Sequence, residues 1–186
     1  MAELRRIRVM ISSRSLSPAF AAGTPLGEIR RRLQAHLEAL RLYRPPADGQ
    51  PANRAGPDQP LFDVWIHETD AGRTIDHSTL QMSLQEINRA DVVIVLYTGE
   101  AGSAPGGASL GICHAEFQEA WSRRPEIVGV LRLLPLKDGG DARDRRFRDD
   151  MERLNPPATD VADEAELQAR TVELLQQRMA QLAKRG

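Results

Sequence analysis

Of the side chains in this sequence, that of Glu116, a carboxylate, is best placed to do chemistry. It follows an apolar run, Val92 to Tyr97, and a loop rich in glycine and serine, and it falls in the first turns of an expected helix together with Cys113. Open α/β sheets usually build a ligand site from a strand, a Gly-rich loop and an acidic residue near a helix start. A carboxylate there could stabilise or attack an oxocarbenium-like centre, as in glycosidic cleavage. The alternative is an ordinary solvent-facing glutamate.

Polar residues also follow the first two expected strands. Ser12, Ser13 and Arg14 offer hydroxyls, loop amides and a cation, which suit a phosphate, ribose or carboxylate group. Asp70 follows the second strand and could contact ribose or substrate. The alternative for Ser12, Ser13 and Arg14 is routine loop capping, and the alternative for Asp70 is a solvated loop acid.

The loop that leads to Glu116 supplies the other candidate contacts, Gly99 and Ser109, and it fits a lid or a merely mobile loop. Its glycines match neither a Walker loop nor a dinucleotide-binding fingerprint. Cys113 is either a substrate contact or a small buried packing residue, because no base is placed to activate it. His114 is expected at the surface or as a capping residue. The four histidines lack metal-ligand spacing, so no metal site is expected.

The elements that position these residues follow from hydrophobic periodicity. Strands are expected at Ile7–Ile11, Leu61–His67, Val92–Tyr97 and Ile127–Leu134, with a weak fifth at Asp160–Ala162. Helices are expected at Pro25–Leu42, before Arg89, at Leu110–Ser122, around Phe147–Leu154 and at Asp163–Arg185. This alternation predicts an α/β three-layer sandwich with a four- to five-stranded, mostly parallel sheet, flavodoxin-like in type. Right-handed crossovers then bring the loops that follow the strands together at the carboxyl edge.

Length and composition set further bounds. The 186 residues predict one domain, with Arg44 to Pro60, which holds five prolines, as a surface insertion or disordered segment. A net charge of −1 argues against a nucleic-acid binder. No apolar run approaches the roughly 18 residues of a membrane span. The N-terminus lacks a signal-peptide pattern. A single cysteine forbids an internal disulfide and fits a reducing compartment. Together these features predict a soluble cytoplasmic protein.

Three segments carry a resemblance to a known family. They are IRVMISSRS at 7–15, DVVIVLYTG at 91–99 and SLGICHAEFQEAW at 109–121. Together they resemble the Toll/interleukin-1 receptor (TIR) domain pattern, in which the last motif reads Cys-x-x-Glu, here Cys113 and Glu116. The chain also resembles a bacterial TIR-like domain of unknown function that occurs ahead of STAND-type NTPases; Trp65, Ile66 and Glu68 echo that pattern.

The resemblance implies an activity. Catalytic TIR domains cleave the nicotinamide–ribose bond of NAD, and nucleoside deoxyribosyltransferases use a helix-borne glutamate in a similar place. Both comparisons assign the catalytic role to Glu116 and place Ser12 to Arg14 in a nucleotide pocket. They imply NAD as a substrate rather than a bound cofactor, assembly into a homo-oligomer on activation, and a STAND-type NTPase as a partner. The setting they imply is bacterial anti-phage defence.

Two alternatives stay open at the level of sequence. One is a non-catalytic TIR-like module for protein interaction or oligomerisation, with the helix at 163–185 as a packed final helix or an assembly surface. The other is a nucleoside or nucleotide N-glycosidase with a different substrate.

Overall fold

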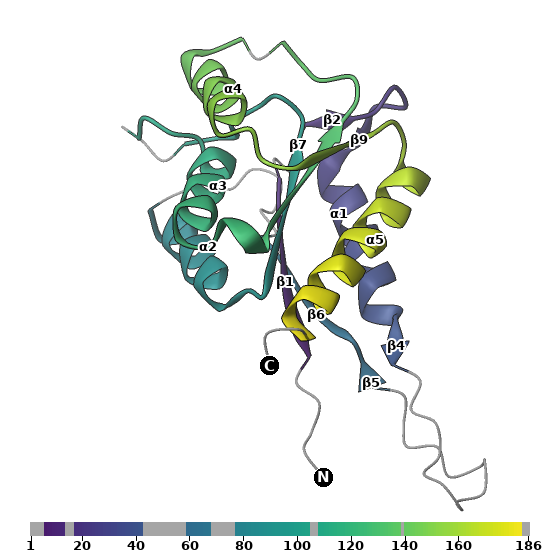
Figure 1. Ribbon diagram of the computed structural model, residues 1–186. Helices are drawn as coiled ribbons and strands as arrows, with labels where there is room; N and C mark the ends of the chain where they lie inside the picture. Colours follow the sequence, from purple (N-terminus) through teal and green to yellow (C-terminus); the bar gives the residue numbers. More distant parts are fainter. Residues whose placement is uncertain are drawn as a thin grey trace, which may run out of the picture.

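A five-stranded parallel sheet lies between two layers of helices in the computed structural model (Figure 1). The structure describes residues 6–13, 17–42, 59–67, 77–104, 108–138 and 140–183. The strands are β1 (Ile7–Ser12), β6 (Phe62–Ile66), β7 (Val92–Tyr97), β8 (Val128–Leu133) and β9 (Ala158–Val161), in the order β6-β1-β7-β8-β9. Counted along the chain, this order is 2-1-3-4-5, the flavodoxin-like arrangement. The predicted fold class is confirmed.

The strands form a central sheet because their apolar residues face both layers. All six residues of β7 are buried, as expected for a parallel strand covered on each side. Val92, Ile94 and Leu96 pack into one core, and Val93, Val95 and Tyr97 pack into the other. Successive side chains along a strand therefore serve opposite faces.

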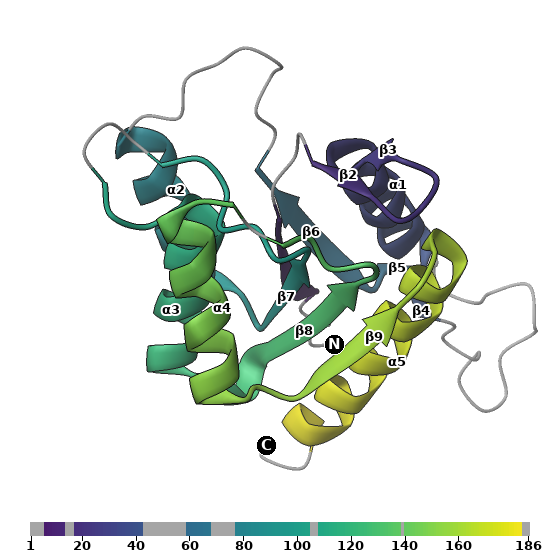
Figure 2. The same cartoon turned by 90° about the horizontal axis from the view of Figure 1, so that it is seen from above.

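Helices cover both faces of the sheet (Figure 2). Helices α1 (Leu26–Ala39) and α5 (Glu164–Ala183) pack on the first face through residues such as Leu33, Leu37 and Leu167. Helices α2 (His77–Arg89), α3 (Ile112–Arg123) and α4 (Ala142–Leu154) pack on the second, where Phe117 and Phe147 are fully buried. The C-terminal helix is thus a packed layer of the fold.

Short elements account for the differences from the expected boundaries. The first helix ends at Ala39 instead of Leu42, because β4 (Arg41–Leu42) pairs antiparallel with β5 (Gln59–Pro60). This pair closes the ends of the expected insertion, whose residues 43–58 lie outside the described ranges. A second small pair joins β2 (Pro18–Ala19) to β3 (Thr24–Pro25), and a 3-10 turn at Pro125–Ile127 leads into β8.

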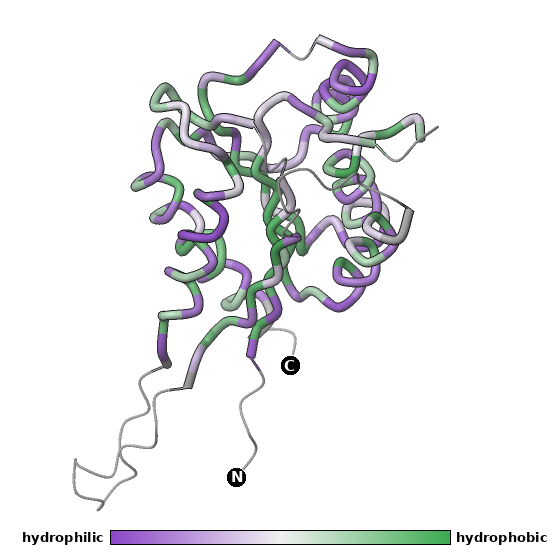
Figure 3. Tube along the Cα trace, turned by 180° about the vertical axis from the view of Figure 1, so that it is seen from behind, coloured by the Kyte–Doolittle hydropathy of each residue, from purple (hydrophilic) through white to green (hydrophobic). Residues whose placement is uncertain are grey.

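The hydropathy of the elements carries one further observation. The tube in Figure 3 places the apolar residues along the strands and the inward faces of the helices, with polar residues outside. In the ranges that the structure describes, none of the helices is both long and apolar enough to cross a membrane.

Candidate active site

The carboxyl ends of β1 and β7 form the topological switch point of the sheet. The connection from β1 leads through α1 to β6 on one side, and β7 continues to β8 on the other. Doubly wound sheets bind their ligands in the crevice outside such a point. Ser12, the last residue of β1, pairs with Val95 of β7 and marks this position.

Glu116 reaches this position from α3. Its side chain is only 3% exposed, and its Oε2 accepts a hydrogen bond of 2.5 Å from the Oγ of Ser12. Ser12 is itself 1% exposed. The alternative of a solvent-facing glutamate is therefore wrong. A buried carboxylate that joins a strand end to a helix is instead a candidate for chemistry at the sheet edge.

The loop after β7 fixes the start of α3 and thereby the direction of Glu116. The backbone amide of Ile112 donates to the Ser103 carbonyl at 2.8 Å, and that of Cys113 donates to the Ala101 carbonyl at 3.1 Å. Gly111 is required because a Cβ there would lie 2.2 Å from the Ala101 oxygen. The loop carbonyls thus satisfy free amides of the first helical turn and hold the helix against the loop.

Asp144 anchors the same loop from α4. Its Oδ1 accepts a hydrogen bond of 2.8 Å from the Ala101 amide, and the side chain is only 8% exposed. A charged acceptor on a backbone amide is a strong contact. The position of Glu116 therefore depends on a chain of contacts that runs from α4 through the loop to α3.

Arg30 supplies a buried cation from the opposite helical layer. It lies on α1, is 2% exposed, and donates through Nη1 to the Ser13 carbonyl at 3.2 Å and through Nη2 to the His67 carbonyl at 2.7 Å. These carbonyls lie just beyond the carboxyl ends of β1 and β6, so the guanidinium holds the two strand ends together. Its charge also acts on Glu116.

The electrostatics of Glu116 are set by opposing effects. Burial raises its pKa above the ordinary range of a glutamate, while the hydroxyls of Ser12 and Ser83 and the charge of Arg30 lower it. Ser83 lies on α2 and is fully buried. Burial prevails, so the carboxyl takes up a proton at a higher pH than an exposed glutamate would. Carboxyls with such displaced pKa values are typical of sites that do chemistry.

Among the described residues, the other predicted substrate contacts are not gathered in one site around Glu116. Ser13 is buried, and its carbonyl binds Arg30. Cys113 is 3% exposed and belongs to the core beneath α3, where its Sγ packs so closely on Gly102 that a Cβ there would lie 2.8 Å from it. Ser109 is exposed before α3. Arg14 and Asp70 lie outside the described residues.

Gly99 belongs to a different part of the sheet edge. Its φ is +92°, and a Cβ there would lie 2.4 Å from the Lys137 carbonyl oxygen, so only glycine fits. It lines a separate cavity beside β7 and β8 and not the surroundings of Glu116.

Arg30 and Ser83 were not among the predicted site residues, although their positions on apolar helical faces could have indicated a buried role. Both interrupt apolar helical faces, Arg30 beside Ile29 and Leu33, and Ser83 one turn from Leu80 and Ile87. A polar residue inside an apolar stripe needs a buried partner.

The expectation that His114 lies at the surface is wrong. It is 1% exposed, stacks on Phe147 with ring centroids 4.7 Å apart, and its Nε2 lies 2.8 Å from Oδ2 of Asp150. Hydrogen bonds from Gln118 and Arg153 to Asp150, together with the His114 contact, hold the pKa of that carboxyl at about 2 against the opposing effect of burial. The histidine joins α3 to α4.

Comparison of the sequence with protein-family models and with curated proteins gave no match. The chemistry of the site therefore rests on its own residues.

Proposed function

We propose that this chain is a TIR-like NAD nucleosidase that cleaves the nicotinamide–ribose bond, with Glu116 as the catalytic carboxylate. The observation that carries the proposal is the buried Glu116 carboxylate, hydrogen-bonded to Ser12 at the switch point of the sheet. The three segments with the TIR resemblance give further support. They contain β1, β7 and most of α3, and α3 contacts both strands.

The chemistry proposed for Glu116 needs its ionised form. As the bond between C1′ of the ribose and the nicotinamide nitrogen breaks, the electron pair leaves with nicotinamide, and C1′ gains positive charge. The ionised carboxylate stabilises or bonds to that carbon. Water then adds its oxygen to C1′ and releases a proton, so NAD and water give nicotinamide, ADP-ribose and a proton.

The surrounding residues suit this role. Ser12 donates to one oxygen of Glu116, and Arg30 favours the charged form, so both act against the burial that would keep the carboxyl neutral. A charge that is only partly solvated interacts strongly with a developing cation, since little water screens it. The same arrangement would serve another N-glycosidic substrate.

The test is to incubate the purified chain with NAD at a range of protein concentrations and to measure the nicotinamide released by chromatography. Nicotinamide mononucleotide and a set of nucleosides are the comparison substrates. We expect nicotinamide and ADP-ribose in equal amounts, with a rate per protomer that rises with concentration if assembly completes the site. Release of bases from nucleosides alone would replace NAD as the substrate. No turnover of any substrate at any concentration would favour the interaction module.

A further inference from the structure

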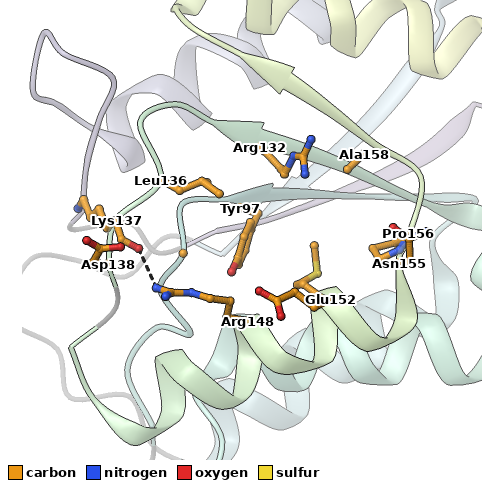
Figure 4. Close-up of a pocket in the computed structure, with 12 residues that line it drawn as sticks. Tyr97, Arg132, Leu136, Lys137, Asp138, Arg148, Glu152, Asn155, Pro156 and Ala158 are labelled. Atoms are coloured by element: carbon orange, nitrogen blue, oxygen red, sulfur yellow. Dashed lines mark hydrogen bonds between the residues drawn. The ribbon is translucent and has the colours of Figure 1, made fainter.

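A cavity lies at the carboxyl edge of the sheet, apart from Glu116. It has a volume of about 370 Å³ and opens between α4, the carboxyl ends of β7 and β8, and the first residue of β9 (Figure 4). Tyr97 and Arg132 are partners in the β7–β8 register and line its sheet side, and Arg148 and Glu152 line it from α4 on the facing side. The volume is within the range of small-molecule sites, about 300–1,000 Å³.

One cation of this cavity has no acidic partner in the described part of the chain. Arg132 pairs with Asp160 at 2.5 Å, and Lys137 pairs with Glu100 at 2.9 Å. Arg148 donates from Nη2 to the Lys137 carbonyl oxygen at 3.2 Å and forms no ion pair with a described carboxylate. Its guanidinium is held in place at one end of the cavity with donors to spare, which suits an anionic group.

An aromatic wall stands beside this cation. Tyr97 is 4% exposed, and its ring is fixed by an edge-on contact with Phe147, with centroids 5.0 Å apart. Burial raises the pKa of Tyr97, and the neighbouring Arg148 guanidinium opposes this effect only in part, so the hydroxyl stays protonated in the cavity. Leu136 lines the same space and is 39% exposed, an uncommon state for a large apolar side chain in this molecule. Leu136 therefore supplies most of the exposed apolar surface of this wall, and Tyr97 adds a small part of it.

A carboxylate lies one helical turn from Arg148, and an amide lies two turns from it. Glu152 is exposed, lines the cavity and forms no ion pair among the described residues, and Asn155, at the end of α4, lies next along the wall. One turn of helix advances about 5.4 Å, so one wall of the cavity presents a cation and a carboxylate on neighbouring turns of α4. A carboxylate is a common partner for a ribose diol.

We propose that this cavity binds a phosphorylated ribosyl compound of mononucleotide size. Arg148 receives the phosphate, Glu152 and Asn155 receive the ribose hydroxyls, and Tyr97 and Leu136 flank the base. The site is distinct from that of the reaction proposed for Glu116, because its lining does not include Ser12, Ser83 or Arg30, the residues that act on that carboxylate. A molecule bound there lies against the Lys137 segment and α4, and Asp144 of α4 anchors the loop that positions α3.

The test is isothermal titration of the full chain with AMP, ribose 5-phosphate, adenosine and inorganic phosphate. AMP carries no nicotinamide–ribose bond, so the NAD cleavage proposed for Glu116 does not consume it, and chromatography after the titration checks that its adenine–ribose bond is intact. We expect saturable binding of AMP. Ribose 5-phosphate should bind more weakly, because it lacks the base, and adenosine should bind little, because it lacks the phosphate. Arg148→Gln removes a charge-assisted contact and should weaken AMP binding by about tenfold or more.

Two variants make the result specific. Arg146→Gln alters an exposed arginine of the same helix outside the cavity and should bind AMP as the wild type does. Glu116→Gln should also bind AMP normally, which separates this cavity from the Glu116 site. Glu152→Gln should weaken AMP more than inorganic phosphate. Absence of saturable AMP binding, or equal binding by Arg148→Gln and wild-type proteins with similar melting temperatures, would overturn the proposal.

Discussion

Replacement of Arg30 by methionine separates the structural and electrostatic parts of the candidate site. Arg30 donates to the Ser13 carbonyl at 3.2 Å and to the His67 carbonyl at 2.7 Å, and its side chain is 2% exposed. Methionine keeps most of the buried stem but removes both donors and the charge. Hydrogen bonds to charged groups contribute about 1.5–3 kcal/mol each. Because the bond to the Ser13 carbonyl is long and therefore weaker, we expect the unfolding free energy to fall by about 2–4 kcal/mol.

The assay is urea unfolding at neutral pH, followed by circular dichroism. The control is Arg31→Met, which alters the neighbouring exposed arginine of the same helix and should change the unfolding free energy by less than about 1 kcal/mol, the usual limit for a surface contact. The mechanism also predicts an effect on Glu116. Loss of the Arg30 cation should raise the pKa of Glu116 further, because that charge favours the ionised carboxyl.

Titration of the Glu116 carboxyl by carbon-13 NMR measures that effect directly. The reasoning is refuted if Arg30→Met is as stable as Arg31→Met, since the two carbonyl contacts would then contribute nothing. An unchanged Glu116 titration in a folded Arg30→Met protein would refute the electrostatic part alone.

Two further predictions concern the same framework. Because the pKa of Glu116 is higher in the folded than in the unfolded chain, its stabilising effect is complete below the unfolded pKa and is lost as the pH rises through the folded value. Glu116→Gln should therefore gain melting temperature relative to the wild type as the pH rises, and parallel curves would contradict the buried-carboxylate account. Asp144→Ala should cost about 1–3 kcal/mol in urea unfolding, because the Ala101 amide loses its acceptor. Asp149→Ala, an exposed change on the same helix, is its control, and equal losses would show that the anchor is unimportant.

The sheet and its layers could be predicted because their signals are continuous along the chain. Val92 to Tyr97 is apolar at every position and coincides with β7, and the leucines of α1 recur at helical spacing. The β4–β5 pair could not be predicted, since two-residue strands have no periodicity, and only their pairing ends α1 at Ala39.

The candidate site was predictable only in part. Glu116 and Ser12 stand out because they follow strands and loops at the edge where such folds bind ligands. Arg30 and Ser83 do not, because a polar residue on an apolar helical face is explained only by what it meets in the folded chain. The same holds for His114, which is buried by α4 rather than exposed.

The most direct test of the central claim compares NAD turnover by the wild type, Glu116→Gln and Glu119→Gln at matched protein concentration. Glu119 lies on the same helix but pairs with Arg123 at the surface, so its variant controls for loss of a glutamate on α3. We predict that wild type and Glu119→Gln release nicotinamide at similar rates, while Glu116→Gln melts no lower than the wild type and releases none. Turnover by folded Glu116→Gln at the wild-type rate would contradict the assignment of Glu116 as the catalytic carboxylate.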